Sequence, residues 1–199
     1  MSQQNEVAGI AERAADDKTL FGFWAYLMTD CMVFASLFAT YSVLHNNTAG
    51  GPSGQDLFSM PYVMVETMLL LTSSFTVGLA ILAARNHNRN TVIFWFALTF
   101  LLGTAFLTLE LTEFSRLVVE GNSWRRSGFL SGYFTLVGTH GLHILIGLIW
   151  MLTTVPRLLT DGFSRVNLRR LTMLSLFWHF LDIVWIFIFT IVYLMGNIV

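Results

Sequence analysis

The apolar run at residues 171–198, LTMLSLFWHFLDIVWIFIFTIVYLMGNI, constrains the fold of this chain more than any other segment. It is long enough to cross a lipid bilayer as a helix, because about 20 apolar residues suffice. Two ionisable residues, His179 and Asp182, lie in its interior. Each costs about 2.5–3.5 kcal/mol at the centre of a membrane helix on insertion scales, so it must face protein, a cavity or a partner. The segment therefore predicts a membrane helix with one polar, inward-facing side.

Two tryptophans belong to that polar side. Helical geometry places Trp178, Asp182 and Trp185 on one face of the segment, with His179 at its edge. Because an indole N–H is a hydrogen-bond donor, we expect the two flanking indoles to serve the Asp182 carboxylate. This face is the first candidate for a functional site.

The composition of the whole chain indicates an integral membrane protein. Of its 199 residues, 55% are hydrophobic and only 12% are charged, whereas a soluble domain carries about 25% charged residues. The net charge of −1 leaves no basic surface large enough to indicate a nucleic-acid partner. The single cysteine, Cys31, excludes a disulfide within the chain.

The apolar segments predict the fold class. An open sheet is excluded in lipid, because the polar groups at its edges would stay unsatisfied. We therefore expect an all-α, polytopic membrane protein built as a bundle of five transmembrane helices. The polar and acidic residues 1–19 form an N-terminal tail, expected to be a mobile cytoplasmic segment or a surface helix, before a transmembrane domain at 20–199. The five spans are placed at residues 20–44, 61–84, 91–119, 129–155 and 171–198.

The distribution of Lys and Arg predicts the orientation of the bundle. Most basic residues lie in the tail and in the loops after the second and fourth spans: Arg13, Lys18, Arg85, Arg89, Arg157, Arg165, Arg169 and Arg170. The opposite side carries only Arg116, Arg125 and Arg126. Because positively charged loops remain inside, the N-terminus is expected in the cytoplasm and the C-terminus in the periplasm.

Three carboxylates are expected to share one level near the outer ends of the second and third spans: Glu66, Glu110 and Glu113. Arg116 follows Glu113 by one helical turn, which is within pairing distance. One interpretation is a proton relay through the membrane. The other is a structural cluster held by arginine pairing and a shared proton. We favour the structural interpretation.

The histidines allow a second functional hypothesis, a metal or haem site. His140 and His143 share one face of the fourth span, and His179 could approach them from the fifth. A di-iron site in a helix bundle uses Glu-x-x-His pairs on two helices, whereas here the Glu and His pairs lie on different helices. We therefore favour interhelical hydrogen bonds, typically worth about 0.6 kcal/mol each in a membrane.

Asp30 is the remaining ionisable residue at mid-depth, and it stands alone on the first span. Three alternatives stay open for its side chain. It is protonated, it pairs with a histidine of the fourth or fifth span, or it faces a partner subunit.

Small residues flank the histidines of the fourth span. Gly138 and Gly141 lie on either side of His140. Because small residues let helices approach closely in lipid, we expect close helix packing at these two glycines.

Four segments of the chain together resemble subunit III of the haem–copper terminal oxidases. The resemblance extends over nearly the whole chain from Phe21 onward, and His-Gly-Leu-His combined with Trp-His-Phe-x-Asp is a specific pattern. Mitochondrial-type members have seven helices, so five helices and the text FATYSVLHNNTAGGPSGQDLF (38–58) indicate the bacterial quinol oxidases of the cytochrome bo type. The four segments are FGFWAYLMTDCMVFASLFATY (21–41), TLELTEFSRL (108–117), GTHGLHILIGLIW (138–150) and FWHFLDIVWIFIFTIVYLMG (177–196).

The resemblance implies an accessory subunit of a respiratory complex in the bacterial cytoplasmic (inner) membrane. Such a complex oxidises ubiquinol, reduces dioxygen to water and pumps protons. The haems and copper of the family belong to subunit I, so this chain is expected to hold no cofactor, metal or catalytic residue. The implied partners are subunits I, II and IV and phospholipids, with ubiquinol bound by the complex. In seven-helix members, lipids lie in a cleft beside two helices that this chain lacks.

The candidate site residues are therefore expected to stabilise the bundle or to contact lipid or other subunits. Within the family, the third subunit of an aa-type menaquinol or cytochrome c oxidase remains an alternative. Outside it, the alternative is an independent proton-conducting or haem-anchoring membrane module, which a visible spectrum would distinguish. The candidates are Asp30, Glu66, Glu110, Glu113, His140, His143, Trp178, His179, Asp182 and Trp185.

Overall fold

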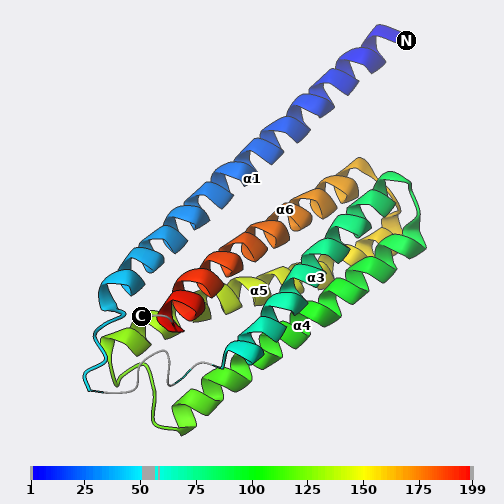
Figure 1. The fold of residues 1–199 in the computed structure, drawn as a ribbon. Helices are drawn as coiled ribbons and strands as arrows, with labels where there is room; N and C mark the ends of the chain where they lie inside the picture. The colour runs from blue at the N-terminus through cyan, green and yellow to red at the C-terminus, as the bar shows by residue number, and fades with distance from the viewer. Residues whose placement is uncertain (1, 51–56, 58, 198–199) are drawn as a thin grey trace.

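The computed structural model describes residues 2–50, 57 and 59–197, which form helices and loops with no strand among them. Five helices are long and apolar enough to cross a membrane, which confirms the predicted all-α fold with five spans (Figure 1). These helices are α1 (Ser2–Leu44), α3 (Met60–Arg85), α4 (Arg89–Val119), α5 (Gly128–Asp161) and α6 (Arg165–Ile188). The chain then continues as a π-helix, Phe189–Leu194, and a 3-10 turn, Met195–Asn197.

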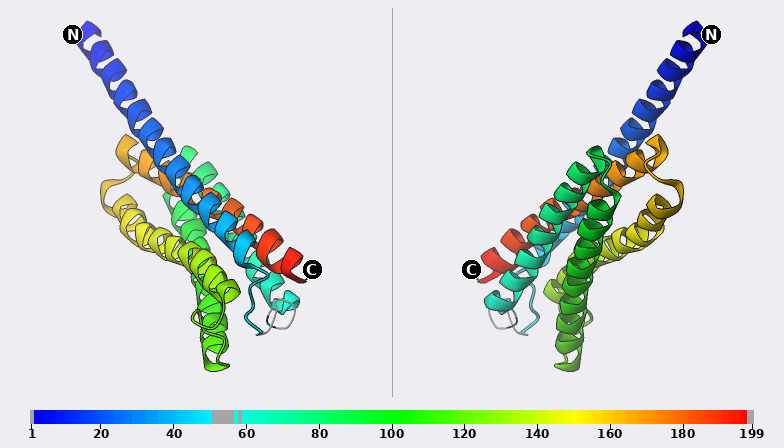
Figure 2. Two further views of the ribbon diagram at one scale, coloured as in Figure 1. Left: turned by 90° about the vertical axis from the view of Figure 1, so that its left-hand side faces the viewer. Right: turned by 90° about the vertical axis from the view of Figure 1, so that its right-hand side faces the viewer.

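Four of the helices form the core of the bundle. Helix α3 packs against α4 and α6, and α5 completes the ring by packing against α4 and α6. Helix α1 lies outside this ring and contacts α5 and α6 (Figure 2). The N-terminus lies at the same end of the molecule as the α3–α4 and α5–α6 loops, whereas the C-terminus lies at the opposite end (Figure 1).

Side-chain caps explain where three of the helices begin. Asn88, Ser127 and Ser164 precede α4, α5 and α6 respectively. Each side-chain oxygen accepts a hydrogen bond from the backbone N–H three residues later, at 3.4, 3.2 and 3.2 Å. Such caps satisfy N–H groups that have no partner inside the helix.

Helix α1 begins earlier than the predicted span. It starts at Ser2, whereas the apolar segment was placed from residue 20. The intervening residues contain no proline, and half of them are Ala, Glu, Gln or Arg, which are strong helix formers. The helix therefore continues through the polar segment, which extends beyond the other helices (Figure 1).

Helix α5 ends later than the predicted span. The fourth span was placed up to residue 155, immediately before Pro156, but α5 passes through this proline to Asp161. A proline inside a helix removes one backbone hydrogen bond and usually ends or kinks the helix. Here the helix continues, and its end is marked instead by Gly162, at φ 66°.

Helix α1 is attached along one narrow line of contact. Over residues 17–44, only Leu27, Phe34 and Tyr41 are buried. They are spaced by seven residues, so they lie on one side of the helix at every second turn. We call these three residues the α1 seam.

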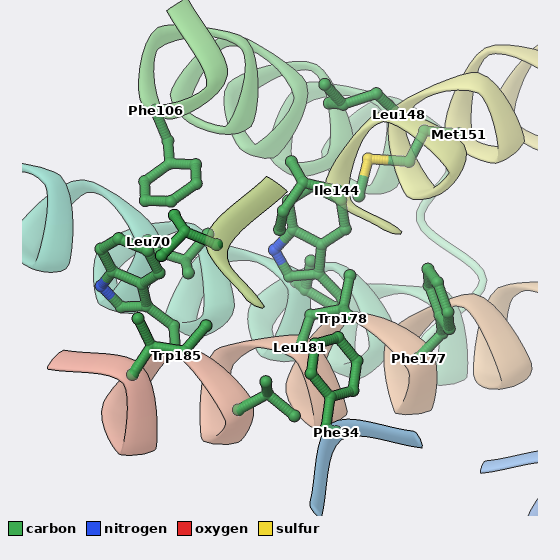
Figure 3. Close-up of a cluster of buried hydrophobic side chains, with 14 of the residues drawn as sticks. Phe34, Leu70, Phe106, Ile144, Leu148, Met151, Phe177, Trp178, Leu181 and Trp185 are labelled. Carbon is green, nitrogen blue, oxygen red and sulfur yellow. The ribbon is translucent and has the colours of Figure 1, made fainter. Parts of the chain in front are cut away.

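The centre of the ring is filled by aromatic and aliphatic side chains. Trp178 and Trp185 are the largest fully buried side chains, and both point from α6 into the cluster (Figure 3). The Trp185 ring lies 4.7 Å from the Phe106 ring, nearly perpendicular to it. Such edge-to-face contacts stabilise aromatic pairs beyond the burial of their area.

Two glycines make room for the Trp178 indole. A Cβ atom built on Gly103 would lie 2.8 Å from Trp178 Cη2, and one built on Gly147 would lie 2.9 Å from Cζ3. By contrast, a Cβ on Gly138 or Gly141 would make ordinary contacts at 3.6 and 3.7 Å. The tightest glycine contacts therefore lie at Gly103 and Gly147, against the Trp178 indole, rather than at Gly138 and Gly141.

Candidate functional site

The candidate residues lie mostly inside the helical ring. Seven of the ten predicted side chains are buried: Glu66, Glu110, Glu113, His140, Trp178, Asp182 and Trp185. The other three, Asp30, His143 and His179, are partly buried. These residues do not form one site but four separate groups and one isolated histidine, His140, described in turn.

The first group is the carboxylate cluster, defined as Glu66, Glu110 and Glu113. It lies where α3 begins and α4 ends, and its members are close enough to interact electrostatically. Glu113 forms an ion pair with Arg116 at 2.5 Å, and Arg116 also donates to the carbonyl of Leu57 at 3.1 Å. The predicted pairing of Glu113 is therefore present.

The other two carboxylates are held differently. Glu66 and Glu110 are 1% and 2% exposed. Neither carboxylate oxygen of Glu110 has a hydrogen-bond partner among the described residues. Oε1 of Glu66 has none there either. An ionised carboxylate in such a place carries a large desolvation penalty. Arginine pairing accounts for Glu113 but not for Glu66 and Glu110.

Two buried tyrosines lie within electrostatic range of Glu110. The hydroxyls of Tyr133, from α5, and Tyr193, from the π-helix, lie 3.0 Å apart. Neither tyrosine was among the site residues predicted from the sequence. A tyrosine within an apolar span could have indicated a buried polar contact, because buried tyrosine hydroxyls generally find a hydrogen-bond partner.

The second group joins α6 to α3 through the two indoles. Trp178 Nε1 donates to Ser73 Oγ at 2.9 Å, and Trp185 Nε1 donates to Thr67 Oγ1 at 3.1 Å. The expectation that these indoles serve Asp182 was therefore wrong. Both point past the carboxylate to hydroxyls on the neighbouring helix.

Three buried hydroxyl side chains of α3 were also not among the site residues predicted from the sequence. Thr67, Ser73 and Ser74 are buried on the side of α3 that faces α6. Their signal is a row of hydroxyls inside an apolar helix. That signal is weak, because Ser and Thr can satisfy their hydroxyls on their own helix, as Thr67 does with the carbonyl of Val63 at 2.8 Å.

The third group is His179 with Asp182. The Ser74 hydroxyl lies 2.7 Å from His179 Nδ1 and also interacts with the Asp182 carboxylate. Both residues of α6 therefore contact α3. Among the described residues, no hydrogen bond joins His179 to His140 or His143, although the sequence left that approach open.

The fourth group connects α1 to α5. Asp30 Oδ2 lies 3.7 Å from His143 Nε2, and both side chains are partly buried. His143 Nδ1 lies 2.7 Å from the carbonyl of Thr139, and since a carbonyl can only accept, Nδ1 carries a proton. Of the three alternatives for Asp30, the structure shows the one in which it lies beside a histidine of the fourth span.

His140 does not join the other polar residues by a hydrogen bond. It is completely buried, and neither ring nitrogen has a hydrogen-bond partner among the described residues. Its neighbours are the rings of Trp185 at 5.3 Å, Phe106 at 6.0 Å and Phe34 at 6.4 Å. The i,i+3 histidine pair is thus divided between an aromatic pocket and a contact with α1.

The grouping of potential metal-binding side chains tests the hypothesis of a metal site. Within the described part of the chain, no three side chains among His, Cys, Asp and Glu are grouped so as to hold a metal ion. Six of the ten candidate side chains instead contact a neighbouring helix: Asp30, His143, Trp178, His179, Asp182 and Trp185. Hydrogen bonds of this kind stabilise helix association in lipid.

These features define the class of protein: a five-span, all-helical membrane protein in which the candidate ionisable residues within the spans lie mainly between its own helices. A comparison with protein families matches residues 1–197 to the family described as cytochrome c oxidase subunit III. The chain belongs to this family, as the sequence resemblance predicted.

Comparison with curated proteins agrees with the family. The chain is 54% identical over 198 residues to cytochrome bo(3) ubiquinol oxidase subunit 3 of Pseudomonas aeruginosa, covering 98% of this chain and 95% of the relative. It is 49% identical over 177 residues to cytochrome c oxidase subunit 3 of Bacillus sp. strain PS3, covering 89% and 86%. It is 45% identical, with coverage of 89% and 87%, to quinol oxidase subunit 3 of Bacillus subtilis.

Proposed function

We propose that this chain is the accessory third subunit of a cytochrome bo-type ubiquinol oxidase in a bacterial cytoplasmic membrane. The observation that carries the proposal is the match over 98% of this chain to a relative named subunit 3 of such an oxidase. The complex would oxidise ubiquinol, reduce dioxygen to water and pump protons. The N-terminus would lie in the cytoplasm, since most Lys and Arg residues are at that end.

The proposed role of the chain in that complex is structural. Its polar side chains make hydrogen bonds between helices, as Ser73, Ser74 and Thr67 do with α6. We infer that the chain stabilises subunit I and has no redox centre or catalytic residue of its own. Subunits II and IV would complete the complex, phospholipids would bind at the outer surface of this chain, and ubiquinol would bind elsewhere in the complex.

Purification through this chain tests the proposal. A tag on the chain should recover an oxidase whose extracted haems are of the bo type and which oxidises ubiquinol. Recovery of the chain alone, with a Soret band of its own, would replace the proposal with an independent haem-bearing module.

Two variants test the accessory role within the purified complex. His179→Ala and Asp182→Ala should reduce assembly or durability over many turnovers more than the initial rate of quinol oxidation. Thr172→Ala is the matched control, because this residue is exposed on the same helix. Loss of the chemistry in a fully assembled His179→Ala or Asp182→Ala complex would overturn the accessory role.

A second candidate is the third subunit of an aa-type menaquinol or cytochrome c oxidase. The observation that supports this second candidate is the 49% identity to a relative named cytochrome c oxidase subunit 3. Haem extraction from the complex separates the two candidates, since an aa-type enzyme contains no haem b or o.

A further inference from the structure

An apolar groove runs along the outside of the bundle between α4 and α5. Its volume is about 330 Å³. Phe96 and Met151 form its buried floor, whereas Leu101 and Leu152, at 64% and 57% exposed, stand at its rim. The groove is therefore open to whatever surrounds the subunit on this side.

The lining of the groove disfavours a protein helix as its occupant. None of its lining side chains has a hydrogen-bonding group, and Ala97 is the one small residue among them. Helices associate in lipid through small residues and interhelical hydrogen bonds. A flexible hydrocarbon chain needs neither, and it fills a narrow apolar groove well.

The length of the groove matches one leaflet of the membrane. On α4 the lining runs from Ile93 to Leu101, which corresponds to about 12 Å along a helix. The hydrocarbon core of a bilayer is about 30 Å thick, so one leaflet contributes about 15 Å. The groove accommodates an acyl chain entering from one surface only.

Positive charge marks the surface from which that chain would enter. Pro156, at the end of the groove, is followed directly by the exposed Arg157, and Arg89 precedes Ile93 by one turn of α4. The same end of the bundle carries Arg85, Arg165, Arg169 and Arg170. Basic residues at the mouths of grooves between membrane helices favour anionic lipid headgroups.

We propose that the α4–α5 groove binds an acyl chain of an anionic phospholipid whose headgroup lies beside Arg157. The proposal deepens the phospholipid binding included in the proposed function. The apolar lining selects the chain, and the arginines at the mouth select the charge of the headgroup.

Photo-crosslinking in the intact complex tests the site. The complex, purified through this chain, is reconstituted into phosphatidylcholine vesicles that contain a small fraction of phosphatidylglycerol with a photoreactive acyl chain. Mass spectrometry of the labelled chain should place crosslinks at 93–101 and 151–156. Photoreactive phosphatidylcholine at the same fraction should label these segments several-fold less.

Matched variants separate the two parts of the site. Arg157→Gln should reduce labelling by phosphatidylglycerol about fivefold, the factor expected for one basic side chain at a membrane surface. Arg125→Gln makes the same charge change at the opposite end and should leave labelling unchanged. Ala97→Phe should fill the groove and abolish labelling there by both lipids, whereas Ala25→Phe, on the exposed side of α1, should not.

Two results would overturn the proposal. Equal labelling by both phospholipids would mean that the groove holds bulk lipid only. Labelling of other outer surfaces but not of 93–101 would mean that another subunit covers the groove. Neither result would contradict the proposed function, because that function is tested separately by the subunits and haems that purify with the chain.

Discussion

Single residues decide how the large side chains of α6 fit into this bundle. Trp178 occupies the space left by Gly103 and Gly147, and its N–H reaches a serine on a third helix. Trp185 reaches Thr67 in the same way. In lipid, where apolar burial does not drive helices together, such shape and hydrogen-bond contacts specify the packing.

The contact between Gly147 and Trp178 leads to the first prediction. Gly147→Ala places a methyl group against the buried indole, and overpacking of this kind costs about 1–3 kcal/mol. The unfolding temperature of the subunit should fall by several degrees. Gly138→Ala is the control, since its Cβ would make an ordinary contact at 3.6 Å. Equal effects of the two variants would contradict the packing described for Trp178.

The Trp185–Thr67 hydrogen bond leads to the second prediction. Thr67→Val keeps the shape but removes the acceptor of a buried indole N–H, and should destabilise the subunit by about 0.6–1.7 kcal/mol. Thr72→Val should have little effect, because the exposed Thr72 hydroxyl bonds only to its own helix, at 2.7 Å. A double-mutant cycle with Trp185→Phe measures the pair, and a coupling energy near zero would show that the bond does not contribute.

Glu110 leads to the third prediction, which separates stability from function. Because neither carboxylate oxygen has a partner among the described residues, Glu110→Leu should leave thermal stability unchanged or raise it. Glu113→Leu is the contrast, since it breaks an ion pair with Arg116 and should destabilise the chain. A Glu110→Leu complex with normal stability but reduced proton pumping would favour the proton-relay interpretation over the structural one.

The sequence predicted which faces are polar better than it predicted the partners on those faces. The 3.6-residue period of a helix places Asp182 and Trp185 together, but which hydroxyl an indole reaches depends on the rotation of a neighbouring helix. Thr67 and Ser73 lie more than 100 residues away in sequence from Trp185 and Trp178. No local pattern contains that information.

At the scale of helices, α1 differs from the other four. Only the α1 seam, Leu27, Phe34 and Tyr41, is buried over residues 17–44, and Asp30 contacts His143 beside it. The ring helices each pack against two neighbours within the ring, whereas α1 rests on the outside. Over residues 17–44, most of the surface of α1 is therefore not covered by the rest of the chain.

The α1 seam leads to the fourth prediction. Phe34 contacts the rings of His143 and Phe180 at 5.2 and 6.3 Å, so Phe34→Ala should loosen the docking of α1. A spin label on Cys31, which is exposed, and another on Leu145→Cys of α5 should report a broader distance distribution. Met32→Ala removes a side chain that is 74% exposed and should not change it. An unchanged distribution for Phe34→Ala would mean that the seam does not hold α1.

The number of spans was predicted correctly from apolar composition, whereas the ends of α1 and α5 were not. The number of spans follows from the runs of apolar residues, because a run of this length crosses a bilayer as a helix whatever its tertiary contacts. The start of α1 at Ser2 and the passage of α5 through Pro156 depend on helix propensity and packing outside the hydrocarbon region. The caps at Asn88, Ser127 and Ser164 are visible in the sequence as residues that commonly begin helices.

At the scale of the whole molecule, the two ends of the bundle differ in charge. One end carries the loops with most of the arginines, and the other carries the carboxylate cluster beside Arg116. This difference leads to the fifth prediction. In a Cys31→Ser background, Ser164→Cys should resist a membrane-impermeant maleimide in intact cells, whereas Ser123→Cys should react. The reverse labelling would place the N-terminus outside.

The two indole–hydroxyl bonds have a mechanical consequence for the whole bundle. They join α3 and α6 at Ser73–Trp178 and Thr67–Trp185, two points about two helical turns apart. Because both bonds join the same two helices, a slide of one helix along the other by a single turn, about 5.4 Å, would break both bonds at once. We therefore expect α3 and α6 to move as one unit, and relative motion within the subunit to be greatest at α1, which is held by the α1 seam and the Asp30–His143 contact.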